Sequence, residues 1–183
     1  MSSYYYLMAQ LPGILPNLPL PVTYDQFKET ASRFISARDN KILAALSLEP
    51  PRPEHKTGSV LVDSWYERER ILRLCLERLR AARFKRDVHW TQEEEESVLK
   101  YPDIQQAAKN VSGLESPLDA ERALENIRRS WAESLRGNHF FDSEALFAYA
   151  ISLLLHERGD RFTKEAGRAS YTSIYNQILG EEA

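Results

Sequence analysis

The residues of this chain that could support catalysis are few and scattered. Four consecutive glutamates occupy positions 93–96, but successive helical residues point around the whole circumference and do not converge on one ion. We interpret this acidic run as the solvated first turn of a helix; a divalent-cation site and an acidic docking patch are the alternatives. Cys75, the only cysteine, lies on an apolar helix face, where a thiol behaves as a small hydrophobic group.

The sequence contains no recognisable metal-binding or nucleotide-binding motif. Its histidines are His55, His89, His139 and His156, and they form neither an HExxH motif nor a His-x₃-His pair. His139 stands three residues before Asp142, and we interpret the two as a loop histidine beside a helix cap, with a ligand pair as the alternative. Glycine-rich phosphate loops are also missing. We therefore predict no cofactor, no metal and no enzymatic activity.

The strongest local charge feature is a run of five cations within nine residues, which we call the basic segment. It consists of Arg78, Arg80, Arg83, Lys85 and Arg86. Three interpretations stay open: stabilisation of a helix C-terminus, contact with an acidic protein, and contact with nucleic acid. Phe84 is the only aromatic residue inside the segment, so the segment offers no array of rings for base stacking.

Aromatic residues supply the other candidate contacts. Eight of them could anchor an interface, although each one alone is more typical of a core: Tyr4, Tyr5, Tyr6, Trp65, Trp131, Phe140, Phe141 and Phe147. The three consecutive tyrosines cannot all face one way in a strand, so we expect at least one of them to face water or a partner.

Helices are expected to position nearly all of these residues. Apolar residues at three- and four-residue steps predict the longest helix at about 59–84, with Glu69 among the charged residues of its exposed face. Cap signals at Thr23, Thr91 and Ser116 predict three further helix starts. Other helices are expected after Asp39, over 103–111, from Asp142 or Ser143 to Gly159, and over about 160–179.

The predicted fold class is all-α: an irregular bundle of about six to eight helices in a single domain, residues 1–183. Residues 4–9 are expected to form a strand or an extended segment because aromatic residues favour strands. Four prolines between Pro12 and Pro21 predict an extended, proline-rich strap that lies on the core. Residues 49–58 are expected to form a flexible loop.

Composition restricts the compartment and the partners. A net charge of −3 gives no global attraction to nucleic acid or to anionic membranes. A single cysteine excludes an intramolecular disulfide and fits a reducing compartment. The longest apolar run, 145–155, is too short to span a bilayer, and we expect it to form a buried core helix. The start of the chain lacks the basic region of a signal peptide, so we interpret it as mature, folded chain.

Two stretches of the sequence resemble a known family. The first is YYYLMAQLPGI at Tyr4–Ile14, followed by a helix with Phe27 and by Asp39 before Ile42 and Leu43. The second is Asn138-His-Phe-Phe-Asp142 with Glu144-Ala-Leu-Phe147, followed by Gly167 and a last aromatic-aliphatic helix. Together they resemble a bacterial family encoded with the V-type (vacuolar-type) ATPases, whose members are thought to stand in for the C-type adaptor, the helical protein between central stalk and membrane rotor ring.

The resemblance implies a non-catalytic adaptor that links stalk and ring, while ATP hydrolysis and ion transport belong to other subunits. It implies partners among V-type ATPase subunits and a cytoplasmic location, peripheral on the inner membrane through the complex. The alternatives are a generic helical scaffold or regulator with an unrelated partner, and a nucleic-acid-binding helical protein. The predicted partner contacts are the basic segment and Tyr4, Tyr5 and Tyr6.

Overall fold

The computed structural model describes residues 3–15, 18–162 and 164–181, and this part of the chain contains helices and no strand. The helices are α1 (Ser3–Gln10), α2 (Tyr24–Ser32), α3 (Ala37–Ala45), α4 (Val60–Arg83), α5 (Gln92–Leu99), α6 (Pro102–Ser112), α7 (Pro117–Arg136), α8 (Ser143–Gly159) and α9 (Lys164–Glu181). The all-α prediction is confirmed, with nine helices in the described residues where six to eight were expected.

The predicted helix starts are confirmed by their caps. The hydroxyl oxygens of Thr23, Thr91 and Ser116 each accept a hydrogen bond from a backbone N–H three residues later. Thr23 and Thr91 form complete capping boxes, in which the side chain at the third helical position returns a bond to the cap backbone. Pro117 occupies the first position of α7, where its missing N–H costs nothing.

The prediction of a strand or extended segment at residues 4–9 is wrong, because these residues form α1. Leu7 is fully buried, while Tyr4, Met8 and Leu11 pack against the core beside it. These positions follow the i, i+3, i+4, i+7 spacing of one helix face. The packing of that face against the core outweighs the strand preference of the tyrosines.

The proline-rich strap is confirmed as a non-helical connection between α1 and α2, although Pro16 lies outside the described residues. Leu11, Ile14 and Leu20 pack against the core, as expected. The hydroxyl of Tyr149 in α8 donates a hydrogen bond of 2.9 Å to the carbonyl of Pro12. The strap therefore ties the first helix to a helix that lies far along the chain.

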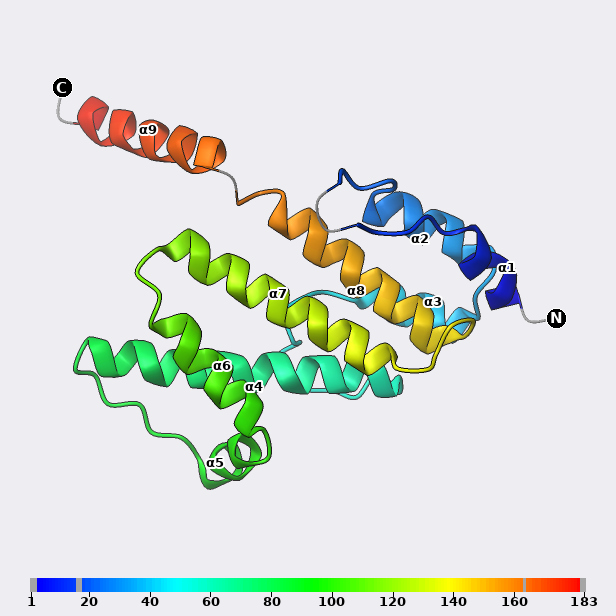
Figure 1. Ribbon diagram of the computed structural model, residues 1–183, viewed down its shortest axis with the longest axis horizontal. Helices are drawn as coiled ribbons and strands as arrows, with labels where there is room; N and C mark the ends of the chain where they lie inside the picture. Colours follow the sequence, from blue (N-terminus) through cyan, green and yellow to red (C-terminus); the bar gives the residue numbers. More distant parts are fainter. Residues whose placement is uncertain (1–2, 16–17, 163, 182–183) are drawn as a thin grey trace.

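Helix α8 occupies the middle of the bundle (Figure 1). The N-terminal helices α1, α2 and α3 pack on one side of it, and α4 and α7 pack on another. Helix α6 crosses α4 and α7, and α5 packs against α4 and α6. The apolar run 145–155 is the buried core helix that was predicted, since Leu146, Phe147, Ile151, Leu153 and Leu155 have no exposed surface.

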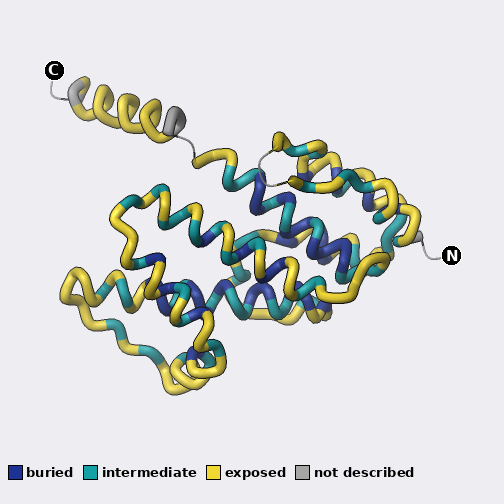
Figure 2. The backbone as a smooth tube through the Cα atoms, in the orientation of Figure 1, coloured by how far each residue is buried: buried dark blue, intermediate teal, exposed yellow. Residues whose placement is uncertain are grey.

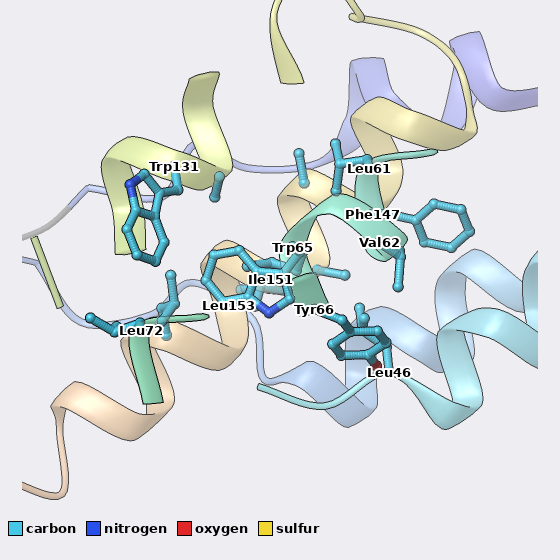
Figure 3. Packing of buried hydrophobic residues seen from close by; sticks show 14 of the residues in the cluster. Leu46, Leu61, Val62, Trp65, Tyr66, Leu72, Trp131, Phe147, Ile151 and Leu153 are labelled. Carbon is cyan, nitrogen blue, oxygen red and sulfur yellow. The ribbon is translucent and has the colours of Figure 1, made fainter. Parts of the chain in front are cut away.

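The core joins α8 to the long helix α4. Trp65 of α4 is fully buried in one cluster with Ile151 and Leu153 of α8, together with Trp131 of α7 (Figure 3). Fully burying one such large side chain contributes roughly 1.5–3 kcal/mol relative to leaving it in water. Cys75 is also buried in this cluster, as its apolar setting predicted.

A buried ion pair connects α4 and α7, and it corrects the expectation that Glu69 lies on an exposed face. Glu69 is 1 % exposed, and its carboxylate accepts two hydrogen bonds from Arg128, at 2.5 Å from Nε and 3.1 Å from Nη2. Glu121 lies 3.7 Å from Arg128 and 2.5 Å from Arg158 of α8. The pair is buried because α7 covers this side of α4, which the spacing of charges along one helix could not indicate.

The end of the chain differs from the prediction of one helix over 160–179. Helix α8 stops at Gly159, the N–H groups of Arg161 and Phe162 bond back to the carbonyls of Arg158 and Gly159, and α9 begins at Lys164. Helix α9 then leads away from the bundle and makes no extensive contact with the other described helices (Figure 1). Its described side chains are exposed on every side (Figure 2).

Candidate protein-binding surfaces

Four aromatic side chains from distant parts of the sequence form one surface group, which we call the aromatic patch: Tyr5, Tyr6, Phe140 and Phe141. Tyr5 and Tyr6 belong to α1, and the two phenylalanines lie in the turn before α8. The ring centroid of Tyr5 is 4.8 Å from that of Phe141 and 5.9 Å from that of Tyr6. Each of the four residues is about half exposed. Gathered apolar rings of this kind are typical of protein-binding sites.

Tyr4, the third predicted contact of the N-terminal group, does not belong to the patch. It is partly buried, and its hydroxyl donates a hydrogen bond to the Asp39 carboxylate and accepts one of 3.2 Å from the Ser36 N–H. Burial and the bond to Asp39 raise the pKa of the Tyr4 hydroxyl. Tyr4 therefore fixes α1 on the N-terminus of α3, while its two neighbours face outward, as the strand argument required by a different route.

A charged pair borders the aromatic patch. His139 Nδ1 lies 2.5 Å from Asp142 Oδ2, while Asp142 Oδ1 accepts the Ala145 N–H at 2.9 Å and caps α8. The hydrogen bond to Asp142 raises the pKa of His139. Burial alone would raise the pKa of Asp142, but the hydrogen bonds from Ala145 and His139 lower it overall. The interpretation of His139 as a loop histidine beside a helix cap fits this geometry.

The basic segment lies at the open end of α4. All five of its cationic residues are exposed, and none forms a salt bridge with another residue in the described part of the chain, whereas Arg68, Arg70 and Arg73 earlier in α4 do. The guanidinium of Arg78 lies over the ring of Trp90 at 4.4 Å. Charges without an internal counter-ion are available to a partner.

The turn that ends α4 positions the last two cations. Lys85 has a positive φ of 54°, and the Arg86 N–H bonds to the Ala81 carbonyl at 2.9 Å while the Lys85 N–H bonds to the Ala82 carbonyl at 3.2 Å. This is the Schellman pattern, in which glycine usually occupies the left-handed position. A lysine there carries a backbone cost that glycine would avoid.

A groove of about 960 Å³ begins beside the basic segment, and we call it the basic groove. Its apolar lining is Leu76, Val111, Leu114, Pro117, Leu118, Ala120, Leu124 and Phe162. Arg80, Arg83 and Arg161 line it as well, and Glu115 and Glu121 are its acidic residues. Glu121 is already paired with Arg158, so the groove combines an apolar floor with an excess of positive charge.

The other residues with possible chemistry have structural roles. The Glu94 carboxylate accepts the Thr91 N–H at 2.8 Å, so the acidic run begins α5 as a cap, as interpreted. Burial raises the pKa of the Cys75 thiol, which disfavours its reactive thiolate. No group of three or more His, Cys, Asp or Glu residues within the described ranges is arranged to hold a metal ion. None of the described helices combines the length and the apolar character needed to cross a bilayer.

Sequence reasoning found the members of the aromatic patch without their arrangement. It named eight aromatic residues, and the structure buries Trp65, Trp131 and Phe147 while it exposes Tyr5, Tyr6, Phe140 and Phe141. One signal did exist, because two adjacent phenylalanines stand directly before the α8 cap, in a turn where neither is held inside a helix. Comparison with protein-family models, with curated proteins and with solved structures finds no match to this chain.

Proposed function

We propose that this protein is a non-catalytic adaptor that connects other proteins, of the kind that links the central stalk of a V-type ATPase to its membrane rotor ring. The observation that carries the proposal is the aromatic patch. Tyr5 belongs to the first stretch that resembles the ATPase-associated family, and Phe141 belongs to the second. Two stretches separated by more than a hundred residues thus contribute rings to one exposed surface.

The bundle is suited to transmit force between two partners. Its core is a single cluster of buried residues drawn from α1 to α8, and packed protein interiors are nearly incompressible. The buried pair of Glu69 and Arg128, extended by Glu121 to Arg158, adds directional contacts among α4, α7 and α8. Such a body resists bending, which is what an adaptor between a stalk and a ring requires.

An adaptor also needs two separate contact surfaces, and this chain offers two. The aromatic patch adjoins the beginning of α8, and the basic groove adjoins its end, about 25 Å away along the helix axis. One surface is aromatic and the other is positively charged, so they suit different partners. We propose that the aromatic patch binds one ATPase subunit and that the basic groove binds an acidic segment of another.

The experiment is a pull-down of the tagged protein from its own source cells, followed by mass spectrometry. We expect V-type ATPase stalk or ring subunits in the eluate of the wild-type protein and their loss with Tyr5→Ser/Phe141→Ser. Leu99→Ser, at an exposed apolar residue of α5, is the matched control and should capture the same subunits. An eluate without any ATPase subunit contradicts the proposal, and capture of an unrelated protein favours a generic scaffold.

The basic groove distinguishes an acidic protein partner from nucleic acid. Its apolar floor favours a protein segment, because phosphate contacts require no apolar surface. Arg80→Glu/Arg83→Glu should release one of the captured proteins, with the largest difference from wild type at low salt. Salt-dependent binding of duplex or single-stranded DNA at about 50 mM salt would instead support the nucleic-acid alternative.

A further inference from the structure

Helix α9 has one apolar face that nothing in the described structure covers. Tyr171, Ile174, Tyr175 and Ile178 stand at the i, i+3, i+4, i+7 positions of that face, and we call them the α9 stripe. They are between 52 and 69 % exposed, and the rings of Tyr171 and Tyr175 are stacked with centroids 6.1 Å apart. The helix meets the basic groove only through Gly167 and Ser170, so the stripe lies beyond it.

A helix of this composition gains little stability on its own. It has 18 residues, includes Gly167 and Gly180, and carries its apolar residues on one side. Short isolated helices are marginal in water, and most helical stability in proteins comes from covering the apolar face. The α9 stripe therefore requires a partner surface.

The order of residues in α9 is complementary to itself in reverse. When two copies lie antiparallel with the two-fold axis between residues 174 and 175, Tyr171 of one copy lies opposite Ile178 of the other, and Ile174 opposite Tyr175. Each end of the stripe thus places an aromatic residue against an aliphatic one. Such a reciprocal arrangement is the isologous contact of a two-fold dimer.

The charges of α9 favour the same arrangement. The helix begins with Lys164 and carries Arg168 one turn later, with Glu165 as the acidic exception, and it ends at Glu181 without a basic residue in its last turn. Cations near the N-terminus and an anion at the C-terminus oppose the dipole of a solitary helix. In an antiparallel pair the basic end of each helix lies beside the acidic end of the other, so the charges become favourable.

From these observations we propose that the protein forms a two-fold dimer through antiparallel pairing of α9 with α9 of a second copy. Covering the stripe and its flanks on both copies removes on the order of 1,000 Å² from water, the lower limit for a specific interface. The dimer is accordingly weak and forms in the micromolar concentration range. This inference does not depend on the ATPase proposal.

The test is sedimentation velocity of the full chain from about 1 to 200 μM. The mass should rise from the monomer value of 21.1 kDa toward twice that value. Ile174→Glu/Ile178→Glu should stay monomeric throughout, with the same far-UV spectrum as wild type. Ser173→Glu/Asn176→Glu adds the same charge on the opposite face of α9 and should dimerise like wild type. A wild-type monomer at 200 μM overturns the proposal, and so does loss of the dimer in the control variant.

Cross-linking checks the direction of the pair. In a Cys75→Ala background, Tyr171→Cys and Ile178→Cys proteins are mixed and treated with a short bismaleimide. Antiparallel pairing predicts that the mixture cross-links several-fold more than either protein alone, because residues 171 and 171 of the two copies are about 10 Å apart along the axis. Stronger cross-linking of each protein with itself indicates a parallel pair and overturns the proposed geometry.

Discussion

Helices α8 and α9 are neighbours in sequence and nearly equal in length, with 17 and 18 residues, yet their surroundings are opposite. Helix α8 is enclosed by α1, α2, α3, α4 and α7, while α9 makes no extensive contact with any of the described helices. Both carry tyrosine and branched aliphatic residues at helical spacing. The difference teaches that an apolar stripe in a sequence indicates a need for a covering surface without indicating whether the same chain supplies it.

The largest expected effect comes from breaking the charge network that ties α8 to its neighbours. Glu69→Ala leaves the buried Arg128 without its counter-ion and should lower the free energy of unfolding by about 3–5 kcal/mol. Urea unfolding followed by circular dichroism measures it. Glu77→Ala, at an exposed position of the same helix, should change the free energy of unfolding by less than about 0.5 kcal/mol. Equal effects of the two variants would show that the pair is not buried.

A matched pair of substitutions tests the comparison of α8 with α9 directly. Ile151→Ala in α8 removes fully buried methyl groups and should destabilise the protein by about 2–5 kcal/mol. Ile174→Ala in α9 should change the free energy of unfolding by less than about 0.5 kcal/mol when measured near 1 μM, where the proposed dimer is dissociated. A large loss at Ile174 under these conditions would mean that the bundle covers α9 in solution.

A smaller effect is expected at the open end of α4. Lys85→Gly removes the cost of a left-handed backbone at a non-glycine residue and should raise the free energy of unfolding by about 1 kcal/mol. Lys85→Ala removes the same charge without relieving the backbone, so it serves as the control and should bring no such gain. If both variants gained equally, charge repulsion within the basic segment would be the cause.

The smallest effect concerns protonation beside the aromatic patch. Asp142 raises the pKa of His139, so the His139 ring resonances should titrate with a midpoint above 6.5 in an NMR experiment. Because the raised pKa belongs to the folded state, the stabilisation is present below pH 6.5 and is lost as pH rises through the folded value. It also needs the charged form of Asp142, whose pKa is lowered, and is lost again under acidic conditions. Asp142→Asn keeps a helix cap and should return the midpoint toward 6.5.

Local signals in the sequence predicted most of the fold. Caps at Thr23, Thr91 and Ser116 and the apolar spacing of α4 depend on residues a few positions apart, and the structure confirms them. The exceptions involve contacts with distant residues. The helical form of α1 depends on its packing against α8, and the burial of Glu69 depends on Arg128 of another helix.

The candidate surfaces could be predicted only in part for the same reason. The basic segment is local in sequence, and its exposure followed from its charge. The aromatic patch joins α1 to the turn before α8, and no pattern along the chain brings Tyr5 to Phe141. The basic groove likewise needs the ends of α4, α6, α7 and α8 to meet.

The hydrogen bond from Tyr149 to Pro12 has a consequence for synthesis of the chain. It joins residues 137 positions apart, and α1, α2 and α3 all pack on α8. The ribosome delivers α8 last among these helices, at about 5–20 residues per second, so the first helices wait several seconds with their apolar faces uncovered. The nascent N-terminal third of this protein is therefore the part that should engage chaperones, and it should be released once α8 has emerged.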